Sequence, residues 1–213
     1  MLSLTERDQE LLSSLCGRVR LFTLEQIAST WWSETKSSKA DSRRRLGKLA
    51  ACDFVQKLRV FAAPLPVLNC AVASWQPSQS PPDFGSVAWK LQKRWEHGPK
   101  AATAYIAGRQ ATKIFGGKPH SSLKIGFQAT HDLGVSQMYL QLKASNPEAA
   151  TRWIGEDVLA PYRKKQKLPD AVIATATSET PELVLEFGGA YDKRRVEEFH
   201  IDCERRSLPY EIW

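Results

Sequence analysis

Apolar and polar residues follow a helical period through the first part of the chain. Leucines recur at helical spacing after Thr5, whose hydroxyl suits the N-cap of a first helix. Thr23 and Gln26 have the spacing of a capping box, in which two side chains pair with free backbone N–H groups at a helix start, and they predict a second, short helix. A third helix is predicted to begin near Asp41 or Ser42.

The pattern then changes to that of β-strands. Residues 54–61 are rich in β-branched and aromatic side chains, and a second such run covers 67–75, after a turn that contains Pro64 and Pro66. We expect these two runs to form a hairpin. Three helices followed by a hairpin is the order of a winged helix-turn-helix, whose third helix enters the major groove of DNA. Residues 1–75 are therefore predicted to be a DNA-binding domain of this kind.

A stretch rich in proline and serine, residues 76–84, has no apolar period and predicts a linker. Residues 85–213 are expected to form a second domain with both helices and strands. Helical spacing is present from residue 84 to 95 and again after His131, where Asp132 suits an N-cap. The chain is therefore predicted to be an α+β protein of two domains.

Strand patterns return near the C-terminus. Residues 168–173 and 182–186 have strand character and are joined by a short polar segment. Asp192 suits the N-cap of a helix over 193–206, and 209–213 is expected to be a closing strand.

Asp170 and Glu186 are the candidate catalytic and metal-binding residues of this region. Asp170 stands at the start of the first of these strands, and Glu186 stands at the end of the second. Because adjacent strands lie about 4.8 Å apart, the two carboxylates can reach one divalent cation. Mg²⁺ is the cofactor expected if the pair is catalytic, and no other cofactor is predicted.

Composition narrows the class of protein. Hydrophobic residues make up 42% and charged residues 25% of 213, which is the balance of a globular protein. The sequence contains no apolar run long enough to span a bilayer and no signal-peptide pattern at Met1, so a cytoplasmic location without a membrane partner is expected. The scattered cysteines predict small buried side chains instead of zinc ligands or disulfides. Gly116 and Gly117 lack the spacing of a phosphate-binding loop, so no nucleotide cofactor is expected.

Charge is concentrated in one segment. The chain has a net charge of +7, and residues 36–59 carry eight basic side chains and two aspartates, so most of the excess lies there. A basic patch confined to one element favours a polyanion partner, and we predict double-stranded DNA. A second basic loop precedes Asp170. The candidate DNA-binding residues of the two segments are Arg43, Arg44, Arg45, Lys48, Lys57, Arg59, Arg163, Lys164 and Lys165.

The C-terminal order of helix, strands, helix and strand, with Pro169-Asp170 on one strand and Glu186 on the next, is similar to the PD-(D/E)XK nuclease core. Together with the winged helix, it resembles the replication-relaxation family of plasmid and mobile-element proteins, in which a winged helix precedes a degraded nuclease-like domain. The shared residues are His131-Asp132-Leu133, Pro169-Asp170, and Leu185-Glu186-Phe187-Gly188-Gly189 with Tyr191 and Arg195.

One departure from the nuclease pattern bears on activity. The pattern has a lysine two residues after the acid, and this chain has Gly188 there, so Lys193 is the candidate for a migrated lysine. The resemblance therefore implies a DNA-binding protein that acts in replication, mobilisation or transcriptional control, with a non-catalytic nuclease-like domain. One alternative is an Mg²⁺-dependent endonuclease that uses Asp170 and Glu186. The other alternative is a protein-interaction module, which could form a homodimer, with Trp89, Trp95 and Trp153 as its anchors.

Overall fold

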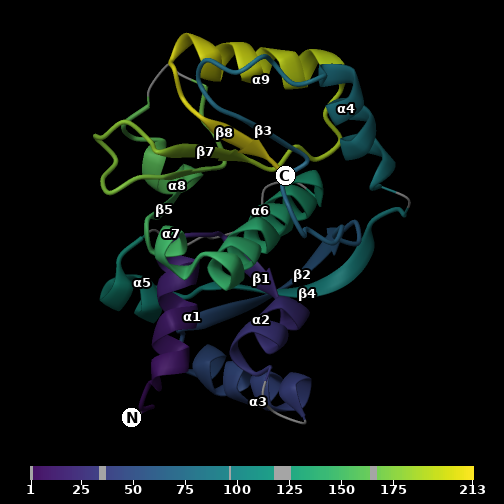
Figure 1. Ribbon diagram of the computed structural model, residues 1–213. Helices are drawn as coiled ribbons and strands as arrows, with labels where there is room; N and C mark the ends of the chain where they lie inside the picture. Colours follow the sequence, from purple (N-terminus) through teal and green to yellow (C-terminus); the bar gives the residue numbers. More distant parts are fainter. Residues whose placement is uncertain (1, 34–36, 96, 118–125, 164–166) are drawn as a thin grey trace. The chain divides into compact units, whose positions relative to one another are not determined.

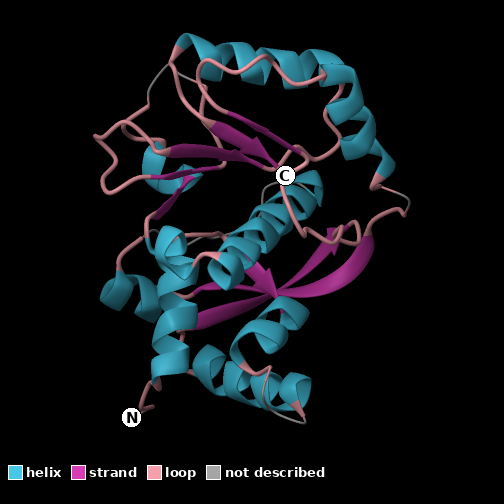
Figure 2. Cartoon of the chain, in the orientation of Figure 1, coloured by secondary structure: helices cyan, strands magenta, loops and turns pink. Residues whose placement is uncertain are grey.

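A computed structural model describes residues 2–33, 37–95, 97–117, 126–163 and 167–213 (Figure 1). Helices and strands are both present and the strands form two sheets, so the predicted α+β class is confirmed (Figure 2). The chain divides into two compact units, each made from two segments. Unit 1 contains Met1–Ala63 and Pro99–Gln137, and unit 2 contains Pro64–Gly98 and Met138–Trp213. The sequence predicts one boundary between the domains, at residues 76–84. The chain instead enters unit 2 at Pro64, returns to unit 1 at Pro99 and enters unit 2 again at Met138.

Unit 1 contains a three-stranded antiparallel sheet in the order β1-β4-β2 together with the helices that precede and follow it. The predicted N-cap Thr5 and the predicted capping box of Thr23 and Gln26 are both present, and the structure adds Asp8, which completes a capping box with Thr5. The elements of this unit are α1 (Glu6–Gly17), β1 (Leu21–Thr23), α2 (Leu24–Trp31), α3 (Ser38–Ala51), β2 (Val55–Ala62), β4 (Lys100–Ala107), α5 (Arg109–Phe115) and the first part of α6 (Gly126–Ser145).

The predicted hairpin between residues 54–61 and 67–75 is wrong. Strand β2 pairs along its whole length with β4, from Val55 opposite Ala107 to Ala62 opposite Lys100. Only the end of the second run forms a strand, β3 (Ala73–Trp75), and it belongs to the other sheet. Proline has no N–H to donate to a sheet ladder, whereas β4 offers eight residues in continuous register.

Unit 2 is built on a five-stranded sheet in the order β3-β8-β7-β6-β5. Strands β7 and β8 are parallel and joined by helix α9, and the other neighbouring pairs are antiparallel. The predicted C-terminal strands and helix are all present. Besides β3 and the last part of α6, the elements are α4 (Phe84–Lys93), α7 (Pro147–Thr151), β5 (Trp153–Gly155), α8 (Glu156–Leu159), β6 (Ala171–Ile173), β7 (Leu183–Glu186), α9 (Lys193–Arg205) and β8 (Tyr210–Ile212).

Helices α4 and α9 pack with this sheet around one apolar core (Figure 1). Leu91 of α4, Val196 and Phe199 of α9, and Tyr210 and Ile212 of β8 are all buried in it. This packing fixes the ends of β6 and β7, where Asp170 and Glu186 stand.

Two smaller predictions are corrected. Asp132 is not an N-cap, because α6 begins at Gly126 and Asp132 lies inside it, buried and paired with Arg20 at 3.0 Å. The cysteines are not uniformly buried, since Cys52 and Cys70 are exposed. Among the described residues, no helix combines the length and the apolar character that a membrane span requires.

Candidate functional site

Helix α3 presents a basic surface to solvent. Its inward side is formed by the buried residues Leu46 and Leu49, which follow the helical period that the sequence predicts. Arg43, Arg44 and Lys48 lie on the exposed side. The buried leucines therefore orient the helix so that three of its four predicted DNA-binding residues face solvent.

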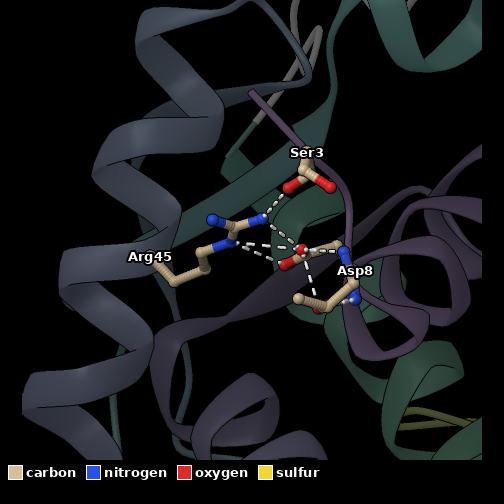
Figure 3. A network of polar contacts seen from close by, with 4 residues as sticks. Ser3, Asp8 and Arg45 are labelled. Atoms are coloured by element: carbon tan, nitrogen blue, oxygen red, sulfur yellow. Dashed lines mark hydrogen bonds and ion pairs between the residues drawn. The ribbon is translucent and has the colours of Figure 1, made fainter. Parts of the chain in front are cut away.

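The fourth residue, Arg45, is tied to α1 instead (Figure 3). Its Nε lies 3.0 Å from Oδ1 of Asp8, its Nη2 lies 2.5 Å from Oδ2, and Nη2 also donates to the carbonyl oxygen of Ser3 at 2.7 Å. Asp8 is fully buried and also accepts the backbone N–H of Thr5 at 2.8 Å. Arg45 is therefore a structural cation that holds α3 against the start of α1.

The protonation of Asp8 follows from this network. Burial raises its pKa, but the hydrogen bonds from Arg45 and Thr5 outweigh burial and bring the pKa below the ordinary value of 3.8. The same interaction raises the pKa of Arg45. Both partners are thus charged at neutral pH.

Strand β2 carries the other basic residues of unit 1. Lys57, Arg59 and Phe61 alternate with inward residues and are exposed on one face of the strand. Lys57 stands opposite Tyr105 of β4. Burial raises the pKa of Tyr105, and the charge of Arg43 acts on that pKa in the opposite direction. Helix α3 and strand β2 are in contact with each other.

In unit 2, the structure brings Asp170 and Glu186 together, as the sequence predicts. The residues that follow and precede them, Ala171 and Leu185, are register partners in the β6–β7 pair. The backbone N–H of Asp170 donates to Oε2 of Glu186 at 3.4 Å, and the N–H of Phe187 donates to Oδ2 of Asp170 at 2.7 Å. Both carboxylates are buried. Each carboxylate thus accepts a backbone hydrogen bond from the neighbouring strand end.

Tyr191 adds a side-chain hydrogen bond to the pair formed by Asp170 and Glu186. Its hydroxyl donates to Oε1 of Glu186 at 2.5 Å, and Nη2 of Arg195 lies 3.4 Å from the hydroxyl oxygen. The guanidinium carbon of Arg195 lies 4.5 Å from the centre of the tyrosine ring. Burial, together with the charge of Glu186, raises the pKa of Tyr191 well above its ordinary range, so the phenol keeps its proton and remains a donor. The hydroxyl of Tyr191 therefore joins the segment before α9 to the carboxylate of Glu186.

Lys193, the predicted migrated lysine, is exposed at the first position of α9. Within the described residues, no hydrogen bond or ion pair joins it to Asp170 or Glu186, and no group of three or more His, Cys, Asp or Glu side chains is arranged to hold a metal ion. Arg195 of the same helix lies within electrostatic reach of Glu186, and its pKa is raised first by Tyr191 and also by Glu186.

The second basic loop is only partly described. Arg163 is half-buried, and its pKa is lowered by burial and also by the charge of Arg206. Lys164 and Lys165 lie outside the described residues. Of the proposed interface anchors, Trp153 is in the core whereas Trp89 is exposed, with Lys93 stacked over its ring at 4.6 Å.

Sequence reasoning missed two side chains: Asp8, which pairs with Arg45, and Tyr191, which donates to Glu186. Asp8 stands three residues after Thr5, which is the capping-box spacing, but its partner Arg45 is 37 residues away. Tyr191 is part of the family resemblance without an assigned role, and its spacing to Glu186 has no strand or helix period. No local pattern identifies either contact.

No protein-family model matches the chain, and comparisons with curated proteins and with solved structures gave no significant match. Function is therefore inferred from the geometry of the two units.

Proposed function

We propose that this chain binds double-stranded DNA through unit 1 and that the carboxylate pair of unit 2 is structural. The observation that carries the proposal is the set of exposed cations on α3 and on the adjoining strand β2. These residues are Arg43, Arg44, Lys48, Lys57 and Arg59. Phosphate contacts from such side chains provide most of the sequence-independent affinity of DNA-binding proteins.

The order of elements in unit 1 supports a winged helix-turn-helix. Helix α1, strand β1, helices α2 and α3, and strands β2 and β4 follow one another, and β4 pairs with both other strands of the sheet. In this interpretation the wing is formed by β2 and β4, and residues 64–98 are inserted between them. Helix α3 would enter the major groove, and the exposed face of β2 would contact the flanking backbone.

The order of unit 2 supports the resemblance to a PD-(D/E)XK core and to the replication-relaxation family. Three antiparallel strands, β5 to β7, are followed by α9 and by β8, which is parallel to β7. Asp170 and Glu186 stand on the two inner strands of that core, as the resemblance requires. Their hydrogen bonds to Phe187 and Tyr191 favour a scaffold without catalysis. We therefore propose a role on plasmid or mobile-element DNA, in replication, mobilisation or transcriptional control.

DNA binding is tested with fluorescence anisotropy of labelled duplexes over a range of salt concentrations. Arg43→Ala and Lys57→Ala should each weaken binding on the order of tenfold and reduce the slope of log affinity against log salt by about one. Arg194→Ala is the matched control, because it removes the same charge from an exposed position on α9. Wild-type affinity that does not depend on salt would contradict the proposal.

A magnesium-dependent endonuclease is the second candidate, and the approach of Asp170 to Glu186 is the observation in its favour. Supercoiled plasmid incubated with the protein and Mg²⁺, Mn²⁺ or EDTA separates the two candidates. We expect the plasmid to remain intact in every case. Nicking that requires metal and is lost in both Asp170→Ala and Glu186→Ala would establish the endonuclease instead.

A further inference from the structure

A basic pocket lies beside the Arg45–Asp8 pair in unit 1. It has a volume of about 310 Å³ and is formed by the start of α1, the residue after α2 and one side of α3. Among the residues that the structure describes, four cationic side chains and one carboxylate contribute to its wall. The lining residues are Arg7, Trp32, Asp41, Arg44, Arg45 and Lys48.

One wall of the pocket is rigid. Nε and Nη2 of Arg45 are held by Asp8 and Ser3, whereas Nη1 points away from Asp8 (Figure 3) and has no hydrogen-bond partner within the described residues. Because Asp8 is fully buried, this guanidinium cannot swing out without leaving a buried charge unpaired. Arg45 therefore presents a fixed edge with available donors to a ligand in the pocket.

The facing wall also contains a preplaced cation. The guanidinium carbon of Arg7 lies 4.9 Å from the centre of the Trp32 ring, and Trp32 is buried. The face of an aromatic ring attracts a cation electrostatically, so Trp32 holds the charge of Arg7 beside the pocket. Arg7 stands one position before Asp8 in α1, so the same turn of helix fixes Arg45 and carries Arg7.

Arg44 and Asp41 form the adjustable part of the lining. Nη2 of Arg44 lies 2.7 Å from Oδ1 of Asp41, but 74% of the Arg44 side chain is exposed. An exposed pair of this kind contributes little free energy, so Arg44 can leave Asp41 for a stronger anion at small cost. Asp41 is then a lining group that repels an anion.

We propose that this pocket holds a phosphate group of the DNA backbone, with Arg7, Arg44, Arg45 and Lys48 as its ligands. The source is taken as DNA because the pocket shares α3 with the exposed basic surface formed by Arg43, Lys57 and Arg59. Its volume leaves space for the sugar beside the phosphate. The proposal deepens the proposed function and rests on it, and it adds Arg7 and Asp41, which lie outside the predicted DNA-binding set.

The first test compares single substitutions in duplex binding. Arg7→Ala and Lys48→Ala should each weaken binding on the order of tenfold for every duplex sequence and lower the salt slope by about one. Arg109→Ala, which removes an exposed arginine of α5 away from the pocket, should bind as the wild type does. Wild-type binding by Arg7→Ala and Lys48→Ala would overturn the pocket proposal and leave the proposed function intact.

The second test looks for tighter duplex binding, because a variant that fails to fold would bind DNA more weakly and not more tightly. Asp41→Asn removes the repelling charge, keeps an oxygen for the hydroxyl of Ser37 and releases Arg44. We expect duplex binding to tighten severalfold with a steeper salt slope. Unchanged or weaker binding by Asp41→Asn would count against a phosphate at this position.

Titration with inorganic pyrophosphate separates failure of the pocket from failure of the proposed function. We expect the backbone amide resonances of Arg7, Trp32 and Lys48 to shift in the full-length wild type and not in Arg7→Ala. If the wild type binds no duplex and these shifts still occur, the proposed function fails and the phosphate pocket stands. If no shift occurs, the pocket proposal fails. Equal or stronger shifts with polyglutamate would assign the pocket to an acidic peptide instead.

Discussion

Helices α3 and α9 have similar numbers of arginines but arrange their charges differently. In α9, Arg194 pairs with Glu198 at 2.8 Å and Arg205 pairs with Asp202 at 2.9 Å, within single turns of the same helix. In α3, Asp41 is the acidic residue within the helix, and Arg45 reaches an aspartate on another helix. A count of basic residues thus does not distinguish the helices, whereas the position of the acidic partners does.

The two helices also begin differently. Asp192 caps α9 by accepting the backbone N–H of Arg195 at 2.8 Å. Ser37 makes no side-chain bond to the backbone of α3. Both helices bury apolar residues, but α9 also has a side-chain N-cap, whereas α3 is joined to another helix through Arg45. Tertiary anchoring leaves the other basic residues of α3 facing solvent, which is what a polyanion-binding helix requires.

The largest expected effect is at the tertiary anchor of α3. Arg45→Ala leaves the buried carboxylate of Asp8 without its cation, so the free energy of unfolding should fall by about 3 kcal/mol. Chemical denaturation followed by circular dichroism measures this change. Arg44→Ala is the control on the same helix, because its pair with Asp41 is exposed and should be worth less than about 0.5 kcal/mol. Equal effects of the two substitutions would remove the distinction between α3 and α9.

The ionisation of Asp8 should make this anchor dependent on pH. The folded pKa lies below the ordinary value of 3.8, so the pair stabilises the folded chain above that pH and loses this contribution as the pH falls through the folded pKa. The difference in unfolding free energy between wild type and Asp8→Asn should therefore be constant near neutrality and shrink below about pH 4. A difference that grows on acidification would show that Asp8 is not ionised in the folded chain.

Next in size is the hydroxyl of Tyr191, which joins the start of α9 to the carboxylate cluster. Tyr191→Phe leaves an oxygen of buried Glu186 without this donor and should lower the unfolding free energy by about 2 kcal/mol. Tyr162→Phe, at an exposed tyrosine of the same unit, is the control and should have almost no effect. Thermal denaturation of the two variants in parallel measures the difference. A loss in both variants alike would point to a general effect of removing tyrosine hydroxyls.

The smallest effect concerns the helix starts. Asp192→Ala removes the N-cap hydrogen bond of α9 and should cost about 1 kcal/mol. Ser37→Ala removes no such bond from α3, so its effect on the unfolding free energy should be clearly smaller. Urea denaturation of both variants makes the comparison. A larger loss for Ser37→Ala would mean that its hydrogen bond to Asp41 caps α3 indirectly.

The carboxylate pair shows how far sequence reasoning reaches in this chain. The strand character of the two segments predicts that Asp170 and Glu186 approach one another, and they do, because Asp170 directly precedes β6, Glu186 ends β7, and these two short strands pair directly. The role of Tyr191 could not be predicted, since its hydroxyl reaches Glu186 through a loop whose path depends on the packing of α9. The sequence therefore predicts the pair of carboxylates, but it does not predict which groups donate hydrogen bonds to them.

The sequence by itself determined the starts of α1, α2 and α9, the buried stripes and the strand character of the C-terminal segments. These features depend on neighbours within a few residues, such as Thr23 with Gln26 or Leu46 with Leu49. Only the tertiary structure decided that β2 pairs with β4 and that Arg45 anchors to Asp8. A strand's alternation of side chains specifies which face is buried but not which partner completes its hydrogen bonds, and an arginine's charge does not specify which distant carboxylate is buried beside it.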